Sequence, residues 1–506
     1  MNWLDNVISF LSPEWGARRE AWRQYETELR NYDAAGFENG SANWHAVNQS
    51  AELTDRYSRD RVRARTRDLE RNSDMLNSVV NAFKRNVFGS GYSLRPKTGD
   101  DETDKILQNA WKRWCKKQNC DVTGTQSFNQ LMRMCVQRKK VDGGILILKR
   151  YTSQGFLPFQ LQTMEVDELD LAQIQPKSKG NKVAGGIEYN RWNRPMGYWF
   201  RQYDLNGSLS MNPVYVDAKD VIFYFTKRRP SQVREMSDLS PTVTRIRDAN
   251  EFMTAVSVKE RIAACLAVFI RKTVPSQRGR EVDTRHRRSY EGKTIAPGMI
   301  REMDPNDDIQ VVNPNGQGTD AATYIKLMQH MIGAGQGLSY EATSRDMSGT
   351  NYSSARQGMI EDGLTYDDEK ELLMEVMDEI YETFVISCAL AGVIDAPGFW
   401  DNKERYLNHI WTAAPKKWID PAKEATANKT ALNTGQKTFQ QIAAENGRDW
   451  KEQLDETLEV LEYARERGLE IGGVMFGKDG LYNPAGKSAF PGNADSFHPR
   501  SRRRRE

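Results

Sequence analysis

Two long helical patterns in the second half of the chain constrain its fold most. Apolar residues follow a 3.6-residue period from Pro241 to Arg271, and a second helical pattern extends from Ala355 to Ala391. At 1.5 Å per residue, the first of these helices would be roughly 45 Å long. A shorter helical pattern, Asp320 to Met331, lies between them. The spacing of apolar residues therefore predicts three helices here, two of them long.

The first long helix contains the most apolar run of the chain, IAACLAVFI, from Ile262 to Ile270. This run is about half as long as the ~20 residues that a transmembrane helix needs. The N-terminal segment MNWLDNVISFLSPEW has Asp5 where a signal peptide carries basic residues, and it lacks a continuous apolar stretch. We therefore expect no transmembrane helix, and a short amphipathic helix instead of a signal peptide.

The first half of the chain changes from helical to strand-like patterns. Helical spacing predicts one helix from Glu52 to Phe88, ended by the glycines of NVFGSGYSL, and another from Asp104 to Lys117. Five short β-type runs follow between Gly143 and Phe225: GILILKRY, FLPFQLQTM, GGIEYN, GYWFRQY and VIFYF. Two or three helices are expected from Pro421 to Gly468, and disorder beyond Gly472. The region from Gly143 to Phe225 is therefore predicted to be a mixed, strand-rich domain.

Charge is nearly balanced overall but uneven along the chain. The 72 basic and 69 acidic residues leave a net charge of +3, which predicts no global attraction to nucleic acid. One segment between the long helices carries five arginines: Arg278, Arg280, Arg285, Arg287 and Arg288. The second long helix carries ten acidic residues and one lysine between Gln357 and Glu382. Each of these charged segments is either a solvated surface or a binding surface.

Motifs for catalysis, metals and cofactors are absent from the sequence. The five histidines are far apart, and the five cysteines form no CxxC pair, which favours reduced thiols. The segment GLYNPAGKS, from Gly480 to Ser488, has five residues between its glycines, whereas a phosphate-binding loop has four. We therefore expect no cofactor and no metal.

Three stretches, in order, resemble the lambda-type portal family of tailed bacteriophages. They are RVRARTRDLERNSDMLNSVVNAFKRNVFGSGYSLRP (61–96), TKRRPSQVREMSDLSPTVTRIRD (226–248) and GLSYEATSRDMSGTNYSSARQGMIE (337–361). The resemblance extends over roughly residues 40 to 470, and the third stretch is the most specific. One departure is that Glu235 follows Arg234 where the family commonly has glycine in the turn.

The resemblance implies an α+β portal fold assembled as a ring, typically of about twelve subunits, at one vertex of the capsid. Its expected parts are an N-terminal segment (1–40), a strand-rich wing (41–236), a first stem helix (237–272), a clip (273–319), a second stem helix (320–338), a tunnel loop (339–353), a long wing helix with the segment after it (354–420), a helical crown (421–470) and a basic tail (471–506).

The resemblance also implies roles for particular side chains. In and beside the tunnel loop, DNA contacts are expected from Tyr340, Arg345, Asn351, Tyr352 and Arg356. The clip arginines named above would dock the packaging motor. The acidic helix would line the channel with Glu361, Asp362, Asp367, Asp368 and Glu369. Contacts between stem helices of neighbouring subunits are expected from Phe252, Val256, Ile262, Leu266 and Ile270.

The implied function is that of a head–tail connector in the virion, assembled in the host cytoplasm, through which double-stranded DNA is packaged and ejected. The implied partners are further copies of the chain, the terminase large subunit, head-completion or adaptor proteins, and the major capsid and scaffolding proteins. A protein with on the order of 6–10 phosphate contacts already binds DNA non-specifically. A channel should therefore be lined mainly by polar or acidic groups.

Two alternatives belong to other classes of protein. A metal-dependent DNA-processing enzyme would need carboxylates that converge in a cleft. A membrane pore would need a segment that spans a bilayer.

Overall fold

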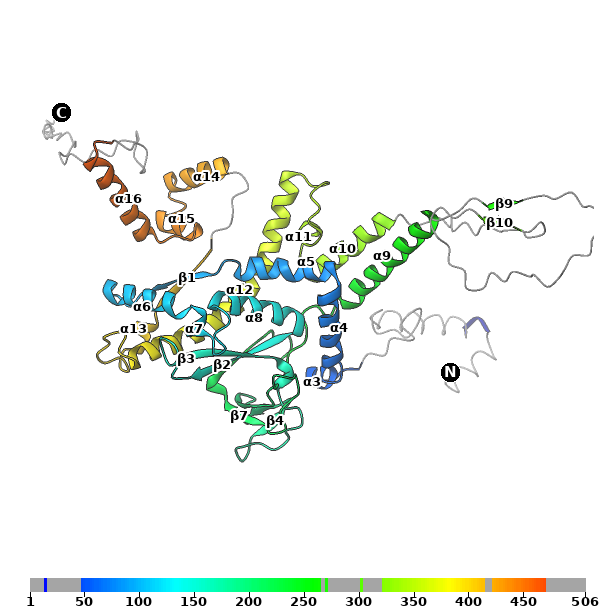
Figure 1. Cartoon of the computed structure of the whole chain (residues 1–506), viewed down its shortest axis with the longest axis horizontal. Helices are drawn as coiled ribbons and strands as arrows, with labels where there is room; N and C mark the ends of the chain where they lie inside the picture. Colours follow the sequence, from blue (N-terminus) through cyan, green and yellow to red (C-terminus); the bar gives the residue numbers. More distant parts are fainter. Residues whose placement is uncertain are drawn as a thin grey trace, which may run out of the picture. The chain divides into compact units, whose positions relative to one another are not determined.

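Our computed structural model of the protein (Figure 1) describes residues 13–15, 47–264, 269–271, 301–303, 321–414 and 421–469. The chain divides into a small unit, residues 1–58 with 228–233, and a large unit with the rest. In the small unit, α3 (Ala51–Asp55) begins after Ser50, whose hydroxyl accepts from the Leu53 amide. The Ala51 amide donates to Ser231 Oγ at 2.9 Å and so joins the two segments of this unit.

The large unit begins with two helices where the sequence predicts one. α4 (Arg59–Asn72) ends before Ser73, whose extended backbone precedes α5 (Asp74–Phe83). The Ser73 hydroxyl accepts from the Leu76 amide and caps α5. α5 continues into the π-helical turn η2 (Lys84–Phe88), which ends at Gly89 with φ +57°. The prediction of one helix is wrong at Ser73, because a local N-cap competes with helix continuation.

The strand-like runs form two antiparallel sheets. β2 (Gly144–Tyr151) lies between β3 (Phe159–Met164) and β8 (Val221–Phe225). The second sheet has the order β4 (Lys182–Ala184), β5 (Ile187–Tyr189), β6 (Pro195–Phe200), β7 (Val214–Asp217). Short 3-10 turns, η3 (Val166–Glu168) and η4 (Ala218–Asp220), adjoin these strands. Each of the five predicted runs contributes a strand, although GGIEYN, FLPFQLQTM and GYWFRQY do so with only part of their residues. Strands β4 and β7 were not predicted. The combination of helices with antiparallel sheets agrees with the predicted α+β class.

β2 faces two apolar cores. Ile145 and Ile147 belong to the larger core, whereas Leu146 and Leu148 pack with Ile187 and other residues of the second sheet. Alternate side chains of a strand point to opposite faces, so a strand covered on both faces reads as the continuous apolar run GILIL. Before β2, α8 (Phe128–Asp142) ends at Gly143 with φ +93°, where a Cβ would lie 2.4 Å from the Met236 backbone.

The helix predicted from Asp104 to Lys117 packs on the first sheet. It is α6 (Asp101–Trp114), followed by the short α7 (Lys117–Cys120). Trp114 stacks on Phe159 of β3 with centroids 5.3 Å apart, and its indole nitrogen donates to the Phe159 carbonyl at 2.8 Å. Trp111 also contacts Phe384, 5.0 Å away, on the long helix α12 (Tyr352–Leu390).

The long helices agree with the predicted ranges, with three corrections. α9 (Val243–Ala264) is not continuous to Arg271, because β9 (Phe269–Arg271) pairs in parallel with β10 (Arg301–Met303). α10 (Ala321–Gly335) continues through Gly333 and Gly335, beyond the helical pattern that the sequence shows to Met331. The predicted loop after α10 contains α11 (Tyr340–Ser344). Figure 1 shows α9 and α10 side by side.

The glycines of α10 allow close packing instead of bending. A Cβ at Gly333 would lie 2.8 Å from the Leu338 carbonyl oxygen. A Cβ at Gly335 would lie 2.8 Å from the Thr242 methyl group, where α10 meets the start of α9.

The C-terminal part returns to the sheet region and then forms three helices. After α13 (Lys403–Leu407), β11 (His409–Ala413) pairs antiparallel with β1 (Tyr92–Pro96). The helices α14 (Pro421–Asn433), α15 (Phe439–Glu445) and α16 (Trp450–Glu466) fall within the range predicted for them.

In the described part of the chain, none of the helices combines the length and the apolar character that crossing a bilayer requires.

Candidate functional site

Helices α9 and α10 pack against each other and leave apolar surface uncovered. Phe252 of α9 contacts Tyr324 of α10, with ring centroids 4.4 Å apart. At the base of the pair, the Gln336 side-chain amide donates to the Asp238 carbonyl at 3.2 Å. Farther along, four large apolar side chains are 38–53% exposed: Met253, Val258, Leu327 and Met331. The described part of the chain therefore does not cover this apolar surface.

The residues predicted for subunit contacts fall in three environments. Phe252 and Val256 are half-buried in α9. Ile262 lies in the last turn of α9, and Leu266 lies outside the described residues. Ile270 belongs to β9, so its predicted place on a helix is wrong. The clip arginines, Arg278 to Arg288, and the segment Gly480 to Ser488 also lie outside the described residues.

Residues 336–351 join α10 to α12 and are hydrogen-bonded to α12. The Asp362 carboxylate accepts from the Ser339 amide at 2.6 Å and from the Ser339 hydroxyl at 2.7 Å. The Thr365 hydroxyl donates to the Gly337 carbonyl at 2.7 Å. Gly337 has φ +68°, and a Cβ there would lie 2.7 Å from Thr365 Oγ1. Glycine is thus needed for the close approach of this connection to α12.

Some of the side chains predicted to contact DNA form contacts within the fold, and others are exposed to solvent. The Tyr340 ring stacks on His330 with centroids 4.3 Å apart, and its hydroxyl donates to Asp346 at 3.2 Å. Asn351 caps α12, because its Oδ1 accepts from the Ser354 amide at 2.8 Å. Arg345 and Arg356 are exposed. The side chain of Tyr352 lies outside the described part. Only the two arginines are therefore available for a phosphate.

Asp346 is the acidic neighbour of Arg345 in this connection. The Ser348 hydroxyl and amide donate to Asp346 at 2.6 and 3.0 Å. These hydrogen bonds lower the pKa of the Asp346 carboxyl. The carboxylate is therefore charged at neutral pH.

The acidic helix uses part of its charge inside the fold. Of the residues predicted to line a channel, Asp362 is buried on Ser339, and Glu369 forms ion pairs with Lys139 and Lys140. Glu379, farther along, pairs with Lys149 at 2.7 Å. Glu361, Asp367 and Asp368 are exposed. Of the five carboxylates predicted to line a channel, Asp362 and Glu369 thus have partners inside the fold, namely Ser339 and the lysines of α8.

Two buried charge clusters were not predicted from the sequence. Asp238, just before α9, and Glu369 share Lys139 and Lys140 of α8; the Lys139–Asp238 and Lys140–Glu369 distances are 3.0 and 2.7 Å. In the second cluster, Glu235 accepts from Arg63 of α4 and from Arg234. The only sequence signal was the pair of lysines in α8, next to the apolar strand β2. The clusters fix α4, α8, the start of α9 and α12 to one another.

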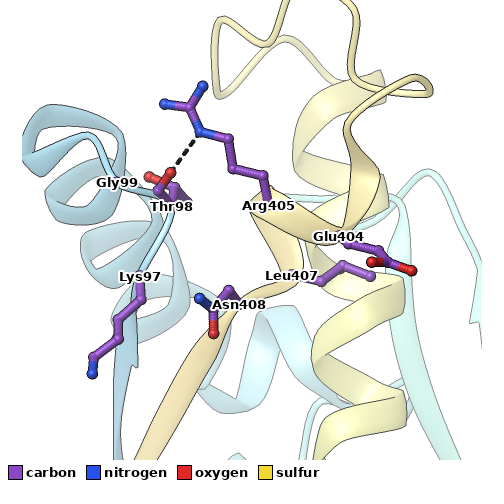
Figure 2. A pocket seen from close by; sticks show the side chains of 7 residues that line it. All are labelled: Lys97, Thr98, Gly99, Glu404, Arg405, Leu407 and Asn408. Carbon is purple, nitrogen blue, oxygen red and sulfur yellow. Dashed lines mark hydrogen bonds between the residues drawn. The ribbon is translucent and has the colours of Figure 1, made fainter.

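The described residues contain no cluster of metal-ligating side chains. No group of three or more His, Cys, Asp or Glu side chains in this part of the chain could hold a metal ion. A hollow of about 530 Å³ is lined by Lys97, Thr98, Gly99, Glu404, Arg405, Leu407 and Asn408. Figure 2 shows Arg405 reaching the Thr98 carbonyl, at 2.6 Å, while Lys97 points away. With one carboxylate, this hollow does not have the converging acids of a metal-dependent nuclease.

The sequence comparisons with known proteins agree on one family. Residues 37–370 match the family described as phage portal protein, lambda family. The probable portal protein of Halomonas phage phiHAP-1 is 24% identical, over 77% of each chain. Portal protein B of Escherichia phage lambda is 18% identical, over 86% of this chain and 91% of its own. A solved structure titled as the neck of an empty GTA particle is 11% identical over 76% of this chain and 93% of its own, with a TM-score of 0.38.

Proposed function

The chain belongs to the lambda family of phage portal proteins, and we propose that it assembles with further copies of itself into a ring through which double-stranded DNA enters and leaves the phage head. Portal proteins are structural components of the phage head, so the chain is not an enzyme. The alternative of a metal-dependent DNA-processing enzyme finds no support among its relatives. We propose a ring of about twelve copies with closed rotational symmetry.

The observation that carries the ring is the uncovered apolar surface of α9 and α10. Met253, Val258, Leu327 and Met331 are partly exposed on a helix pair whose base is held by Gln336 and Asp238. Exposed apolar surface on a rigid element favours association. In a ring, each pair has a neighbour on both sides, so copies of the same helices can cover it. We propose that these two helices are the stem, with Phe252 and Val256 in its contacts.

We propose that residues 339–351 and the start of α12 face the bore. Arg345 and Arg356 are exposed for brief phosphate contacts, whereas Glu361, Asp367 and Asp368 are exposed carboxylates one to four turns farther along. A ring with many inward arginines would hold DNA, because each neutralised phosphate adds to non-specific affinity. Two arginines beside three carboxylates would guide DNA without retaining it.

The remaining assignments follow the family. We propose that the strand-rich part is the wing and that residues 421–470 are the crown. We propose that residues 273–319 are the clip, which contacts the terminase large subunit and then adaptor proteins. The clip contacts would be made by Arg278, Arg280, Arg285, Arg287 and Arg288. The ring would lie at a capsid vertex, in contact with the major capsid and scaffolding proteins, after assembly in the host cytoplasm.

Negative-stain imaging of the purified full chain tests the ring. We expect rings with a central hole; a protein that stays monomeric at every concentration would contradict the proposal.

Deletion of residues 345–350 tests the bore: rings should persist while packaging or retention of DNA falls. Unchanged packaging and retention would show that this segment does not contact DNA. Charge reversal of the clip arginines should abolish motor binding but preserve the ring.

A further inference from the structure

The arginine-rich α4 is divided between inward and outward side chains. Arg63 and Arg67 bind Glu235, Asp142 and Asp167 inside the large unit. Arg61 and Arg65 are exposed, and neither forms an ion pair or hydrogen bond within the described part of the chain. They lie four residues apart, so both occupy one face of the helix, with Cβ atoms ~6 Å apart.

Beside Arg61 and Arg65 is a groove between α4 and the start of α9. Its volume is about 570 Å³, and its lining includes Arg61, Arg65 and Arg247 with Ala64, Leu69 and Val243. The acidic residues in this lining have partners: Glu251 pairs with Arg247 at 2.7 Å, and Asp68 lies 3.6 Å from Arg71. The two unpaired arginines therefore give the groove a positive rim above an apolar floor.

The middle of α12 offers a complementary surface. Glu371 and Glu375 are exposed, and neither has an ion pair or hydrogen bond with the described residues. Like the two arginines, they lie four residues apart on one helix face. Two like charges at this spacing destabilise a helix unless opposite charges approach them. The spacing of the carboxylates on α12 thus matches that of the guanidinium groups on α4.

α8 separates these two surfaces within one chain. It binds α4 through Arg138 and Asp142, and it binds α12 through Lys139 and Lys140. A ring uses a heterologous interface, in which one side of each subunit meets the other side of the next. Complementary charges on the two helices that α8 binds meet this requirement, and they form no ion pair with each other within the described part of one subunit.

We propose that Arg61 and Arg65 of one subunit pair with Glu371 and Glu375 of the next subunit in the ring. The partner is a second copy of this chain, and the proposal rests on the ring formation proposed above. Closely approaching charges at an interface contribute affinity and fix the register of association. The four side chains would thus set the angle between neighbouring subunits. The apolar contacts of the stem are less specific for one angle.

Charge swapping tests this pairing with the purified full chain. R61E/R65E should raise the subunit concentration required for ring assembly on the order of tenfold, and E371K/E375K should do the same. The quadruple variant, with all four charges reversed, should assemble as readily as the wild type. Assembly is followed by sedimentation and negative-stain imaging at low and high salt, because salt should weaken wild-type association. K105E/K112E, which reverses two exposed lysines on α6, is the matched control.

The possible outcomes separate this inference from the ring itself. Wild-type protein without rings would overturn the ring proposal, and this pairing with it. Wild-type rings together with normal assembly of R61E/R65E would overturn the pairing alone. Weak assembly of both double variants without rescue in the quadruple variant would also overturn it, provided that circular dichroism shows each variant to be folded. Intact rings with impaired DNA packaging in R61E/R65E would assign these arginines to DNA instead.

Discussion

Arg63 donates to the Glu235 carboxylate at 2.9 Å, across 172 positions of the sequence, and Glu235 is completely buried. Arg234 donates to the same carboxylate from its other side at 2.7 Å. The family commonly has glycine in this turn, and the structure explains how a glutamate is accommodated. Two guanidinium groups neutralise it in a place where an unpaired charge would be costly.

Replacing Glu235 should be among the most destabilising changes in the large unit. Glu235→Ala leaves Arg63 and Arg234 buried beside a cavity, and loss of one partner from a buried ion pair costs about 3–5 kcal/mol. Glu235→Gln should cost less, because the amide oxygen still accepts one hydrogen bond. Urea denaturation followed by circular dichroism measures both. Glu459→Gln, at an exposed position, is the control, and equal midpoints for the three variants would contradict the prediction.

Asp238 and Glu369 should be energetically coupled, because both bind Lys139 and Lys140. With either Asp238→Asn or Glu369→Gln alone, the two lysines still share one carboxylate. The double variant leaves two buried ammonium groups with none, so its loss of stability should exceed the sum of the single losses by about 0.5–3 kcal/mol. A double-mutant cycle of urea midpoints measures this excess, and additive effects would show that the residues act independently.

Arg345 should tolerate glycine better than a β-branched residue. It ends α11 with φ +61°, and its amide donates to the Glu341 carbonyl at 3.0 Å. This left-handed conformation is readily adopted by glycine and costs other residues about 1–2 kcal/mol. Arg345→Gly should therefore keep stability within about 1 kcal/mol of the wild type, whereas Arg345→Val should lower it. Thermal unfolding compares the two, and a more stable valine variant would contradict the described backbone.

Stability should fall as pH rises above about 9. Burial raises the pKa of Cys120, Cys135 and Cys388 to about 12, from the ordinary thiol value of 9.0. Because these pKa values are raised on folding, the folded state holds more protons than the unfolded state above pH 9. Their contribution is therefore complete below pH 9 and is lost as pH rises toward 12.

Buried tyrosines should add to the same alkaline effect. The pKa values of Tyr92 and Tyr366 are also raised by burial to about 12. Urea midpoints measured from pH 7.5 to 11 should decrease above pH 9, and Cys388→Ala should make the decrease shallower by one proton's contribution. Midpoints that stay constant to pH 11 would contradict this prediction.

The sequence predicted the elements of the fold well where the pattern was local. The strands β2 and β8 and the long helix α12 follow from the pattern of their apolar residues, with bounds close to the predicted ones. Helix α9 was also predicted, but it ends seven residues before the predicted end. The prediction was wrong where a single side chain formed a local hydrogen bond that competes with continuation of the helix. The hydroxyl of Ser73 caps a new helix at a point where the sequence predicts one continuous helix.

The sequence by itself determined the family, the order of helices and strands, and the excess of acid on α12 and of arginine on α4, because these depend on residue type and near neighbours. Only the tertiary structure decided which charges are available. Arg63 and Glu369 have turned inward to Glu235 and to the lysines of α8, whereas Arg61 and Glu371 remain at the surface. Such ion pairs join segments up to 230 positions apart in the sequence. The spacing of residues along one helix does not reveal which other segments pack against that helix in the fold.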